Sequence, residues 1–267
     1  MSRTPTWPTA LISGGGSGIG LRLAEILRSQ GTALAICDLT ITDQALSRLR
    51  GGGQPDVTFH EVDVADGPAV EAAVRDAVEA VGPPALAINS AGINLSRPFD
   101  ELTEEQFRRV VEINLIGSRN FAAAVLPHQR SGAQLGLIAS LAGIVPNYGY
   151  AAYSASKFGV MGLAGCLRLE YAPRGIDVCV VCPPEVETPM VEEERRTGSE
   201  IGLELKKFSG TLEVDEACEE ILAGLQARRT TIVPGRRARL THRLARFVPG
   251  LANRVSDRMV RRTLGGR

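Results

Sequence analysis

A glycine-rich turn between an apolar run and an amphipathic segment constrains the fold of this chain more than any other feature. The apolar run 9–13 precedes Gly14-Gly-Gly-Ser-Gly-Ile-Gly20, and helical spacing then links Ile19, Leu23, Ile26 and Leu27. Glycines let a pyrophosphate approach the backbone, while the free N–H groups of a helix start hold its charge. The stretch predicts a strand, a turn and a helix that bind a dinucleotide through Gly14, Ser17, Gly18, Ile19 and Gly20.

Strands and helices are expected to alternate along the rest of the chain. Short apolar runs, which predict buried strands, recur at 33–37, 57–62, 85–89, 135–139, 176–182 and 230–233. Segments with helical periodicity lie between them, at 42–50, 70–81, 103–127, 151–171 and 214–225. Such alternation is typical of an α/β fold, in which right-handed crossovers join parallel strands. We therefore expect a doubly wound, mostly seven-stranded parallel sheet with helices on both faces.

Polar and small residues at the ends of three predicted strands extend the nucleotide site. Asp38 ends the second strand, and its carboxylate can accept both adenosine ribose hydroxyls and repel a 2′-phosphate, which favours NAD over NADP. Alternatively, Asp38 caps the helix 42–50. Asp63 and Val64 follow the third strand, where the adenine would lie. The fourth strand ends in the small residues expected beneath a cofactor, with Asn89, Ala91 and Gly92 as candidate contacts.

A serine, a tyrosine and a lysine between residues 140 and 157 are the candidate catalytic groups. Tyr153 and Lys157 stand at i and i+4 of the helix predicted from Ala151, so both side chains share one face. An adjacent ammonium lowers the pKa of a phenol, which would make Tyr153 a proton donor and acceptor. Ser140 follows the strand 135–139, at the edge where open α/β sheets bind ligands. Such a tyrosine–lysine pair also arises by chance on helices.

Two further polar residues remain open to more than one interpretation. Asn114 lies among apolar neighbours inside the helix 103–127, and its amide needs partners if it is buried. A structural hydrogen bond to a neighbouring strand and a catalytic role are both compatible with the sequence. Thr188 follows two prolines after the sixth predicted strand and brings a hydroxyl to the same sheet edge. The charged segment 188–210 is either a lid over the substrate or a solvated helix.

Composition places the chain among ordinary globular proteins, since 44% of its 267 residues are hydrophobic and 22% are charged. We expect one catalytic domain over 1–235. Cys179 and Cys182 share one strand and point to opposite faces, so they predict buried thiols in a reducing compartment rather than a redox pair. The three histidines are scattered, and we expect no metal site. Without an apolar leader or a membrane-length apolar run, the body is predicted to be cytoplasmic.

The last forty residues form a basic extension of an acidic body. Residues 228–267 hold twelve arginines and one acidic residue, a net charge of +11 that balances −11 elsewhere. Within 236–267, apolar residues recur at helical spacing, at Leu240, Leu244, Phe247, Leu251, Val255 and Met259. Pro249-Gly250 should interrupt the helix. The segment either docks on anionic lipid or packs against the acidic body or a partner subunit. Nucleic-acid binding is not expected, because interleaved aromatic residues are lacking.

Taken together, these motifs resemble the short-chain dehydrogenase/reductase family over about residues 9–233. The resemblance is carried in order by Gly14 to Gly20, Asp38, Asp63-Val64, Asn89 to Gly92, Asn114, Ser140, Tyr153, Lys157 and the Pro-x-x-x-Thr-Pro of 184–189. It implies a Rossmann-type fold, a nicotinamide cofactor that also contacts Pro183, Val186 and Thr188, and the catalytic set Asn114, Ser140, Tyr153 and Lys157.

The resemblance also implies a role for each catalytic residue. Ser140 would hold the substrate oxygen, and Tyr153 would exchange its proton. Lys157 would bind the nicotinamide ribose and lower the pKa of the tyrosine. Asn114 would hold a water molecule in a proton relay. Members of the family are often dimers or tetramers, so a homodimer or homotetramer is expected.

Two departures from the family pattern narrow the interpretation. The family usually has Pro-Gly after the sixth strand and two asparagines at the fourth, whereas this chain has Pro183-Pro184 and Asn89-Ser90. The two prolines, with the C-terminal extension, are similar to those of 3-ketodihydrosphingosine reductases. Those enzymes resemble NADP users, whereas Asp38 predicts NAD.

The residues expected around the catalytic group are mainly apolar and suggest a hydrophobic substrate, at Leu141, Ile144, Val145, Pro146, Tyr148, Pro184, Val186 and Met190. We therefore expect an NAD-dependent oxidoreductase that interconverts a secondary alcohol and a ketone on a lipid- or steroid-like molecule. Two alternatives are an NADPH-dependent reductase of 3-keto lipids and a non-catalytic dinucleotide-binding regulator. The complete catalytic set argues against the regulator.

Overall fold

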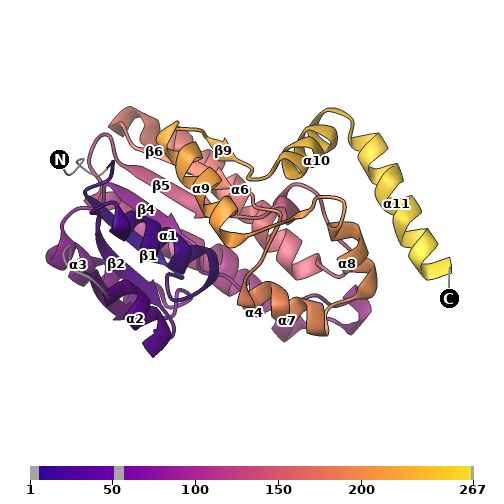
Figure 1. Cartoon of the computed structure of the whole chain (residues 1–267), viewed down its shortest axis with the longest axis horizontal. Coiled ribbons are helices and arrows are strands. Elements are labelled where there is room, and N and C mark those ends of the chain that lie inside the picture. The colour runs from indigo at the N-terminus through magenta and orange to yellow at the C-terminus, as the bar shows by residue number, and fades with distance from the viewer. Residues whose placement is uncertain (1–5, 51–56, 266–267) are drawn as a thin grey trace.

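Seven parallel strands form the central sheet of the computed structural model, which describes residues 6–50 and 57–265 (Figure 1). The strand order is β3-β2-β1-β4-β5-β6-β9. The strands are β1 Thr9–Ser13, β2 Ala33–Asp38, β3 Val57–Glu61, β4 Leu86–Asn89, β5 Gln134–Ile138, β6 Asp177–Val181 and β9 Thr231–Ile232. The predicted seven-stranded parallel sheet is confirmed, and its order is that of a Rossmann-type fold.

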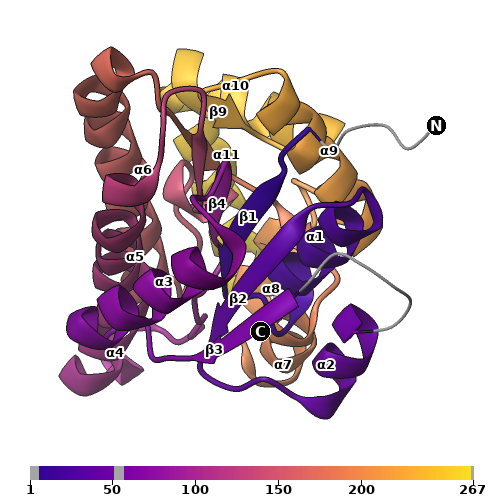
Figure 2. The same ribbon diagram turned by 90° about the vertical axis from the view of Figure 1, so that its left-hand side faces the viewer.

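Helices cover both faces of the sheet, which gives three layers (Figure 2). One face carries α1 Gly18–Ser29, α2 Asp43–Arg50 and α9 Val214–Gln226. The other carries α3 Gly67–Val81, α4 Glu104–Val111, α5 Gly117–Val125 and α6 Ala151–Tyr171. Short 3₁₀ turns lie at Phe99–Glu101, Leu126–His128, Leu141–Gly143 and Ala172–Arg174.

Two apolar cores lie on opposite faces of the sheet because successive strand residues point to opposite sides. In β1, Ile12 packs in the core with the buried residues of α1 and α9, whereas Leu11 packs in the core with those of α3 and α5. Cys179 and Cys182 are likewise divided between the two cores. Their assignment as buried thiols that do not form a redox pair is confirmed.

The long helix predicted over 103–127 is interrupted by a wider turn. Thr103 caps α4 in a reciprocal bond with Gln106, and α4 runs directly into a π-helical turn at Glu112–Ile116 before α5 begins. A π turn accommodates one extra residue and often lies at a functional site. Here it contains Asn114, which is fully buried. The apolar spacing of the sequence does not reveal the extra residue.

A second group of elements lies beyond the carboxyl edge of the sheet. It consists of β7 Glu185–Val186, α7 Pro189–Thr197, α8 Glu200–Lys206 and β8 Thr211–Leu212. β7 and β8 pair in parallel as a small separate sheet, which the sequence did not predict. This pairing fixes both ends of the segment that contains α7 and α8. Those two helices occupy most of the predicted lid 188–210.

Two further helices complete the chain, α10 Arg236–Phe247 and α11 Pro249–Gly265. The break between them falls at the predicted proline, which suits the first turn of a helix. α10 packs against α11, and α11 against α8 (Figure 1). Ala238 is fully buried, and Arg239 forms an ion pair with Glu220 of α9 at 2.5 Å. Among the described residues, no helix is both long and apolar enough to cross a bilayer.

Candidate active site

A cleft of about 470 Å³, here called the nucleotide cleft, opens at the carboxyl edge of the sheet. Neighbouring strands β1 and β4 lead the chain to opposite sides there, and open α/β sheets bind ligands at such a point. Fifteen of the predicted site residues line it: Gly14, Ser17, Gly18, Ile19, Asp38, Asp63, Val64, Ala91, Gly92, Ser140, Tyr153, Lys157, Pro183, Val186 and Thr188. The structure therefore brings together most of what the sequence placed in the site.

The glycine turn is shaped by two close backbone approaches. Gly14 has a φ of +69°, and a Cβ there would lie 2.4 Å from the backbone nitrogen of Ala91. A Cβ on Gly20 would lie 2.0 Å from the carbonyl oxygen of Gly14, so only glycine lets α1 begin so close to the turn. Gly20, which the sequence predicts as a cofactor contact, does not line the nucleotide cleft. Its place is behind the turn, in the packing of α1.

Asp38 turns its carboxylate toward the glycine turn. Its Oδ2 accepts a hydrogen bond from the backbone nitrogen of Gly16 at 2.7 Å, and the side chain lines the nucleotide cleft. The alternative role as a helix cap is wrong, because Thr42 Oγ1 accepts from the backbone nitrogen of Ala45 at the start of α2. The carboxylate is thus placed where a ribose bound along the turn would meet it.

The two predicted site asparagines lie behind the cleft rather than in its lining. Asn89 is buried, accepts from the Ser13 hydroxyl and donates to Ser118 Oγ at 2.8 Å. Asn114 Oδ1 accepts from the backbone nitrogen of Ile93 at 2.8 Å. Its Nδ2 donates to the Ile93 carbonyl and to Ser156 Oγ, both at 3.0 Å. Asn89 therefore does not line the cleft, and Asn114 makes a structural hydrogen bond of the kind that the sequence left open, to the loop after β4 and to α6.

Tyr153 and Lys157 lie on one face of α6, as predicted, and Ser140 faces them from the end of β5. The Lys157 Nζ lies 5.7 Å from the centroid of the Tyr153 ring and donates to the Ile138 carbonyl at 3.0 Å. The hydroxyls of Ser140 and Tyr153 interact by a hydrogen bond. All three side chains line the nucleotide cleft. This arrangement can hold a carbonyl oxygen between two hydroxyls.

Burial dominates the protonation of these groups. It raises the pKa of the Tyr153 phenol to about 12, and the hydrogen bond with Ser140 only partly opposes this shift. This shift runs opposite to the lowering expected from Lys157, because burial disfavours the charged phenolate. Burial also lowers the pKa of Lys157 to about 8. Tyr153 therefore keeps its proton at neutral pH and is poised to donate it.

A second cavity, here called the apolar pocket, adjoins the nucleotide cleft and has a volume of about 150 Å³. Ser140 and Tyr153 line both cavities, as do Pro184, Met190 and Val191. Of the predicted hydrophobic lining, Leu141, Val145, Pro146, Pro184 and Met190 border the apolar pocket. Ile144 and Tyr148 do not line it, and Val186 lines the nucleotide cleft instead. A ligand in either cavity can thus reach the same two hydroxyls.

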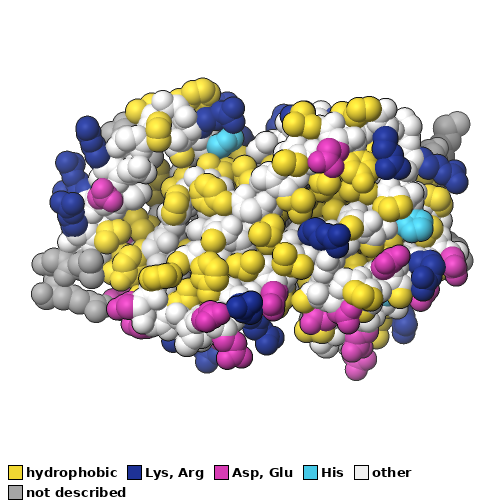
Figure 3. All heavy atoms as spheres, turned by 180° about the vertical axis from the view of Figure 1, so that it is seen from behind, with side chains coloured by type: hydrophobic (Ala, Val, Ile, Leu, Met, Phe, Trp, Pro, Cys, Tyr) yellow, Lys and Arg dark blue, Asp and Glu magenta, His cyan; other side chains and the backbone are white. Residues whose placement is uncertain are grey.

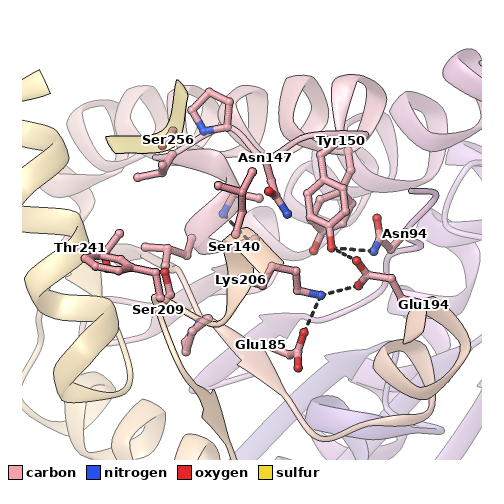
Figure 4. Close-up of a pocket in the computed structure, with 18 of the residues that line it drawn as sticks. Asn94, Ser140, Asn147, Tyr150, Glu185, Glu194, Lys206, Ser209, Thr241 and Ser256 are labelled. Atoms are coloured by element: carbon pink, nitrogen blue, oxygen red, sulfur yellow. Dashed lines mark hydrogen bonds and ion pairs between the residues drawn. The ribbon is translucent and has the colours of Figure 1, made fainter. Parts of the chain in front are cut away.

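One wall of the apolar pocket carries a polar group, here called the Glu194 cluster: Asn94, Tyr150, Glu185, Glu194 and Lys206 (Figure 4). The Tyr150 hydroxyl donates to Glu194 Oε1, and Asn94 Nδ2 donates to Tyr150 at 3.2 Å. Lys206 Nζ lies 2.7 Å from Glu194 Oε2 and 2.6 Å from Glu185 Oε2. The Tyr150 and Tyr153 rings meet edge to face at 5.2 Å. The cluster therefore lies directly beside the candidate catalytic tyrosine.

Side chains of the basic extension line part of the apolar pocket. Leu244 of α10 and Val255 and Met259 of α11 line the apolar pocket, with Thr241 and Ser256 between them. Leu240 and Phe247 remain exposed, and the side chain of Leu251 lies outside the described residues. The single apolar stripe of the sequence is thus divided between the pocket and solvent.

The sequence reasoning missed the Glu194 cluster and the pocket residues of the extension. The only signal for Glu194 is its spacing from Val191, since these two are the buried residues of α7. Tyr150 stands in a tyrosine-rich stretch, yet the i and i+4 spacing to a lysine singles out Tyr153. Lys206 gives no local signal, because its partners are 12 and 21 residues away in the sequence.

The fold and the two cavities define a class: a Rossmann-type oxidoreductase with a nucleotide cleft joined to a mainly apolar pocket. Residues 8–199 match the family described as short chain dehydrogenase. A solved structure of a short chain dehydrogenase/reductase from Burkholderia phymatum in complex with NAD has a TM-score of 0.80 to this chain, at 24% identity over 91% of this chain and 94% of that one. The chain belongs to the short-chain dehydrogenase family and is an oxidoreductase.

Among the curated relatives are 3-dehydrosphinganine reductases. The 3-dehydrosphinganine reductase TSC10B of Arabidopsis thaliana is 32% identical over 230 residues, which cover 83% of this chain and 68% of that protein. A 3-dehydrosphinganine reductase of Danio rerio is 32% identical, over 77% of this chain and 64% of its own length. Oxidoreductase UcpA of Salmonella typhimurium is 34% identical over 194 residues, which cover 72% of this chain and 74% of that protein. The matched parts thus span about two thirds to three quarters of these relatives.

Proposed function

We propose that this protein interconverts a ketone and a secondary alcohol on a long-chain lipid, with reduction of a 3-keto lipid as its main reaction. The single observation that carries this proposal is the meeting of the Ser140 and Tyr153 hydroxyls where the nucleotide cleft joins the apolar pocket. A reducible carbonyl placed there contacts both a proton donor and a neighbouring cofactor site. The similarity to 3-dehydrosphinganine reductases supports a keto lipid as the substrate.

In this proposal each residue has a defined task. A bound nicotinamide nucleotide supplies the hydride. Ser140 donates a hydrogen bond to the carbonyl oxygen, and the Tyr153 hydroxyl gives that oxygen its proton. Lys157 holds the ribose of the cofactor from the floor of the cleft. Asn114 acts behind the site by fixing the backbone at Ile93 beneath the cleft.

We propose NAD as the preferred cofactor on the basis of Asp38. The residues of the nucleotide cleft suit a dinucleotide, since Gly14 leaves room beside Ala91 and the start of α1 at Gly18 lines the cleft. The Asp38 carboxylate, held by the Gly16 nitrogen, can accept the ribose hydroxyls and would repel a 2′-phosphate. Asp38→Asn should reduce the preference for NADH over NADPH, measured as a ratio of kcat/KM values.

The test of the proposed function is a substrate panel. The protein is supplied with NADH or NADPH and with long-chain 3-keto lipids, steroid ketones or short keto acids, and cofactor oxidation is followed by absorbance. We expect the highest kcat/KM with a long-chain 3-keto lipid and NADH. Preferred turnover of short charged keto acids would reject the lipid substrate, and preferred use of NADPH would reject the role given to Asp38.

We also propose that α10 brings the protein to an anionic membrane. Phe247 is 74% exposed and Leu240 is 63% exposed, and Arg243 and Arg246 lie on the same helix. Apolar side chains beside arginines bind an anionic interface. Phe247→Ser should weaken co-sedimentation with phosphatidylserine vesicles, whereas Phe99→Ser, at an equally exposed site of the body, should not. Equal binding by both variants would reject the membrane contact.

A homodimer or homotetramer is the last part of the proposal. Hydrophobic side chains gather across the middle of the face covered by α4, α5 and α6 (Figure 3). Ile116, Phe158 and Leu169 contribute exposed surface to this group of helices. Apolar surface of this kind is typical of subunit contacts. Phe158→Glu should lower the molar mass measured by light scattering; a monomeric wild type would reject the oligomer.

A further inference from the structure

The Glu194 cluster carries an inference that deepens the proposed function and depends on it. Glu194 is 6% exposed, and it is the only acidic residue among the buried polar and charged residues of the described chain. A buried carboxylate is costly unless charged or hydrogen-bonding partners compensate it. Its position in the wall of the apolar pocket, beside Tyr153, therefore calls for a functional explanation.

The charges around Glu194 do not balance. Ion pairs join three carboxylates, those of Glu185, Glu187 and Glu194, to two cations, Arg195 and Lys206. Lys206 contacts both Glu185 and Glu194, so it is shared rather than assigned to one of them. Counted over the residues that the structure describes, this linked group has one negative charge in excess. A cationic ligand in the pocket would neutralise this charge, whereas an anionic ligand would add to it.

Asn94 adds an unused acceptor to the same wall. Its Nδ2 donates to the Tyr150 hydroxyl, while its Oδ1 is shielded from solvent and has no hydrogen-bond partner among the described residues. A buried acceptor without a donor is unfavourable. Because Asn94 and Glu194 both contact the Tyr150 hydroxyl and both line the pocket, one donor group can reach both side chains. An ammonium, with three N–H groups, has the required number of donors.

The Glu194 cluster also lies close enough to Tyr153 to bind a substituent on the carbon next to the reacting carbonyl group. The Tyr150 ring, which holds Glu194, is 5.2 Å from the Tyr153 ring between centroids. After burial and the Ser140 hydrogen bond, the Glu194 carboxylate is the remaining influence on the pKa of Tyr153, which it raises. A group near the carbonyl carbon of the substrate would therefore point toward Glu194 when the carbonyl oxygen meets Tyr153.

We propose that Glu194, with Asn94, binds the ammonium group of a substrate that carries an amine on the carbon next to its ketone. Glu194 is thus a specificity-determining residue for a long-chain 2-amino ketone. Tyr150 positions the carboxylate through its hydroxyl. In the protein without ligand, Lys206 provides the compensating positive charge, and the substrate ammonium joins it when the pocket is filled.

The test compares two substrates in two variants. The substrates are a long-chain 2-amino-3-ketone and the same ketone with hydrogen in place of the amine. Glu194→Gln keeps the shape of the side chain and removes its charge. The matched control is Glu193→Gln on the same helix, where the carboxylate is exposed and paired with Arg196. For each protein, kcat/KM is measured with both substrates, and the cofactor Kd is measured alongside.

We expect the wild type and Glu193→Gln to prefer the amino ketone, and Glu194→Gln to lose at least about tenfold of that preference, with a much smaller change in kcat/KM for the amine-free ketone. An equal loss on both substrates would show a structural role and overturn the proposal, as would an unchanged preference. A preference of the wild type for the amine-free ketone would show that the pocket does not favour a cationic substrate, and it would also overturn the proposal.

A binding measurement on the wild type keeps the proposal testable if Glu194→Gln does not fold. Titration calorimetry compares a long-chain 2-amino alcohol with the matched amine-free alcohol in the presence of NAD. We expect the amino alcohol to bind at least about tenfold more tightly. Equal or weaker binding would overturn the proposal. Wild-type protein that binds the amino alcohol but turns over no ketone would reject the proposed reaction while leaving the ammonium site intact.

Discussion

The nucleotide cleft and the apolar pocket share two hydroxyls but are built in different ways. The cleft is formed mainly by strand ends and the turns after them, and two of its features, the Gly14 approach and the start of α1, belong to the backbone. The apolar pocket is closed by α7, α8, α10 and α11, whose side chains come from distant parts of the sequence. The sheet fixes the first, whereas helix packing and ion pairs fix the second.

Because of this difference, we expect the nucleotide cleft to tolerate fewer substitutions than the apolar pocket. Backbone at the carboxyl edge is fixed by the hydrogen bonds of a parallel sheet buried on both faces. The elements around the apolar pocket lie outside the main sheet: β7 and β8 pair with each other in a separate two-stranded sheet, and side chains make contacts between these elements and the body. We therefore expect substitutions in the cleft to affect cofactor binding and folding, and substitutions in the pocket to affect substrate choice.

The largest effect should come from the residue at the junction of the two cavities. Tyr153→Phe removes the proton donor and should lower kcat by about 10²- to 10⁴-fold. Cofactor binding should persist, because the phenyl ring keeps the shape of the wall. Steady-state kinetics and cofactor fluorescence measure the two quantities. Tyr171→Phe, on the same helix and outside both cavities, serves as the control; similar turnover in both variants would separate Tyr153 from the chemistry.

A second prediction contrasts a glycine of each region. A Cβ on Gly20 would lie 2.0 Å from the Gly14 carbonyl oxygen, whereas a Cβ on Gly250 of α11 meets nothing within 4 Å. Gly20→Ala should lower the free energy of unfolding by about 1–3 kcal/mol, as other overpacked sites do, and abolish tight cofactor binding. Gly250→Ala should change stability by less than about 1 kcal/mol. Chemical denaturation tests both; equal stabilities would contradict the backbone argument.

The third prediction concerns the pocket alone. Leu244 lines the apolar pocket, and Leu240, one turn earlier on α10, is 63% exposed. Leu244→Asp places a charge against a lipid chain and should raise KM for long-chain ketones by about 10- to 100-fold, with the cofactor Kd unchanged. Leu240→Asp should leave KM unchanged in solution. A parallel loss of cofactor affinity in Leu244→Asp would mean that the two cavities are not separable.

The smallest effect is a pH dependence of stability from the cleft. The pKa of Lys157 is lowered by burial from 10.5 to about 8. Below pH 8 the lysine is protonated in both states, and its burial penalty is present in full. As pH rises above 8, the folded protein loses the proton before the unfolded chain does. The free energy of unfolding therefore rises, at up to about 1.4 kcal/mol per pH unit.

Lys157→Met should lack this rise. Denaturant titrations at pH 7.5 and 9.5 give the difference between wild type and variant, in which the contributions of thiols that do not interact with Lys157, such as Cys37 and Cys218, cancel. Parallel stability curves for the two proteins would show that Lys157 is solvated in the folded state.

The fold and the nucleotide cleft were largely predictable because their signals are local. An apolar run, a glycine turn and the start of a helix predict a pyrophosphate site within twelve residues, and spacing along α6 predicts that Tyr153 and Lys157 share one face. Two predicted contact residues lie outside the lining of the cleft. Gly20 and Asn89 have residue types suited to cofactor contact, yet each lies behind the cleft, because α1 packs against the turn and the Asn89 amide bonds to Ser13 and Ser118.

The apolar pocket was only partly predictable for the opposite reason. Its polar wall depends on Lys206 reaching Glu194 and Glu185 across two loops, and nothing in a charged segment distinguishes a buried carboxylate from its exposed neighbours. The extension gave a clear helical pattern, yet the pattern does not say which apolar residues meet the body. Leu244 and Leu240 lie one turn apart and have opposite surroundings.

The shared border of the two cavities has a practical consequence for altering this enzyme. Pro184, Met190 and Val191 face both cavities, so a library that varies them to admit new substrates will also disturb retention of the nucleotide. Val255 and Met259 line only the apolar pocket among the described cavities. Directed evolution toward unfamiliar ketones should therefore begin at α11, where a replacement changes the binding of the ketone without changing the lining of the nucleotide cleft.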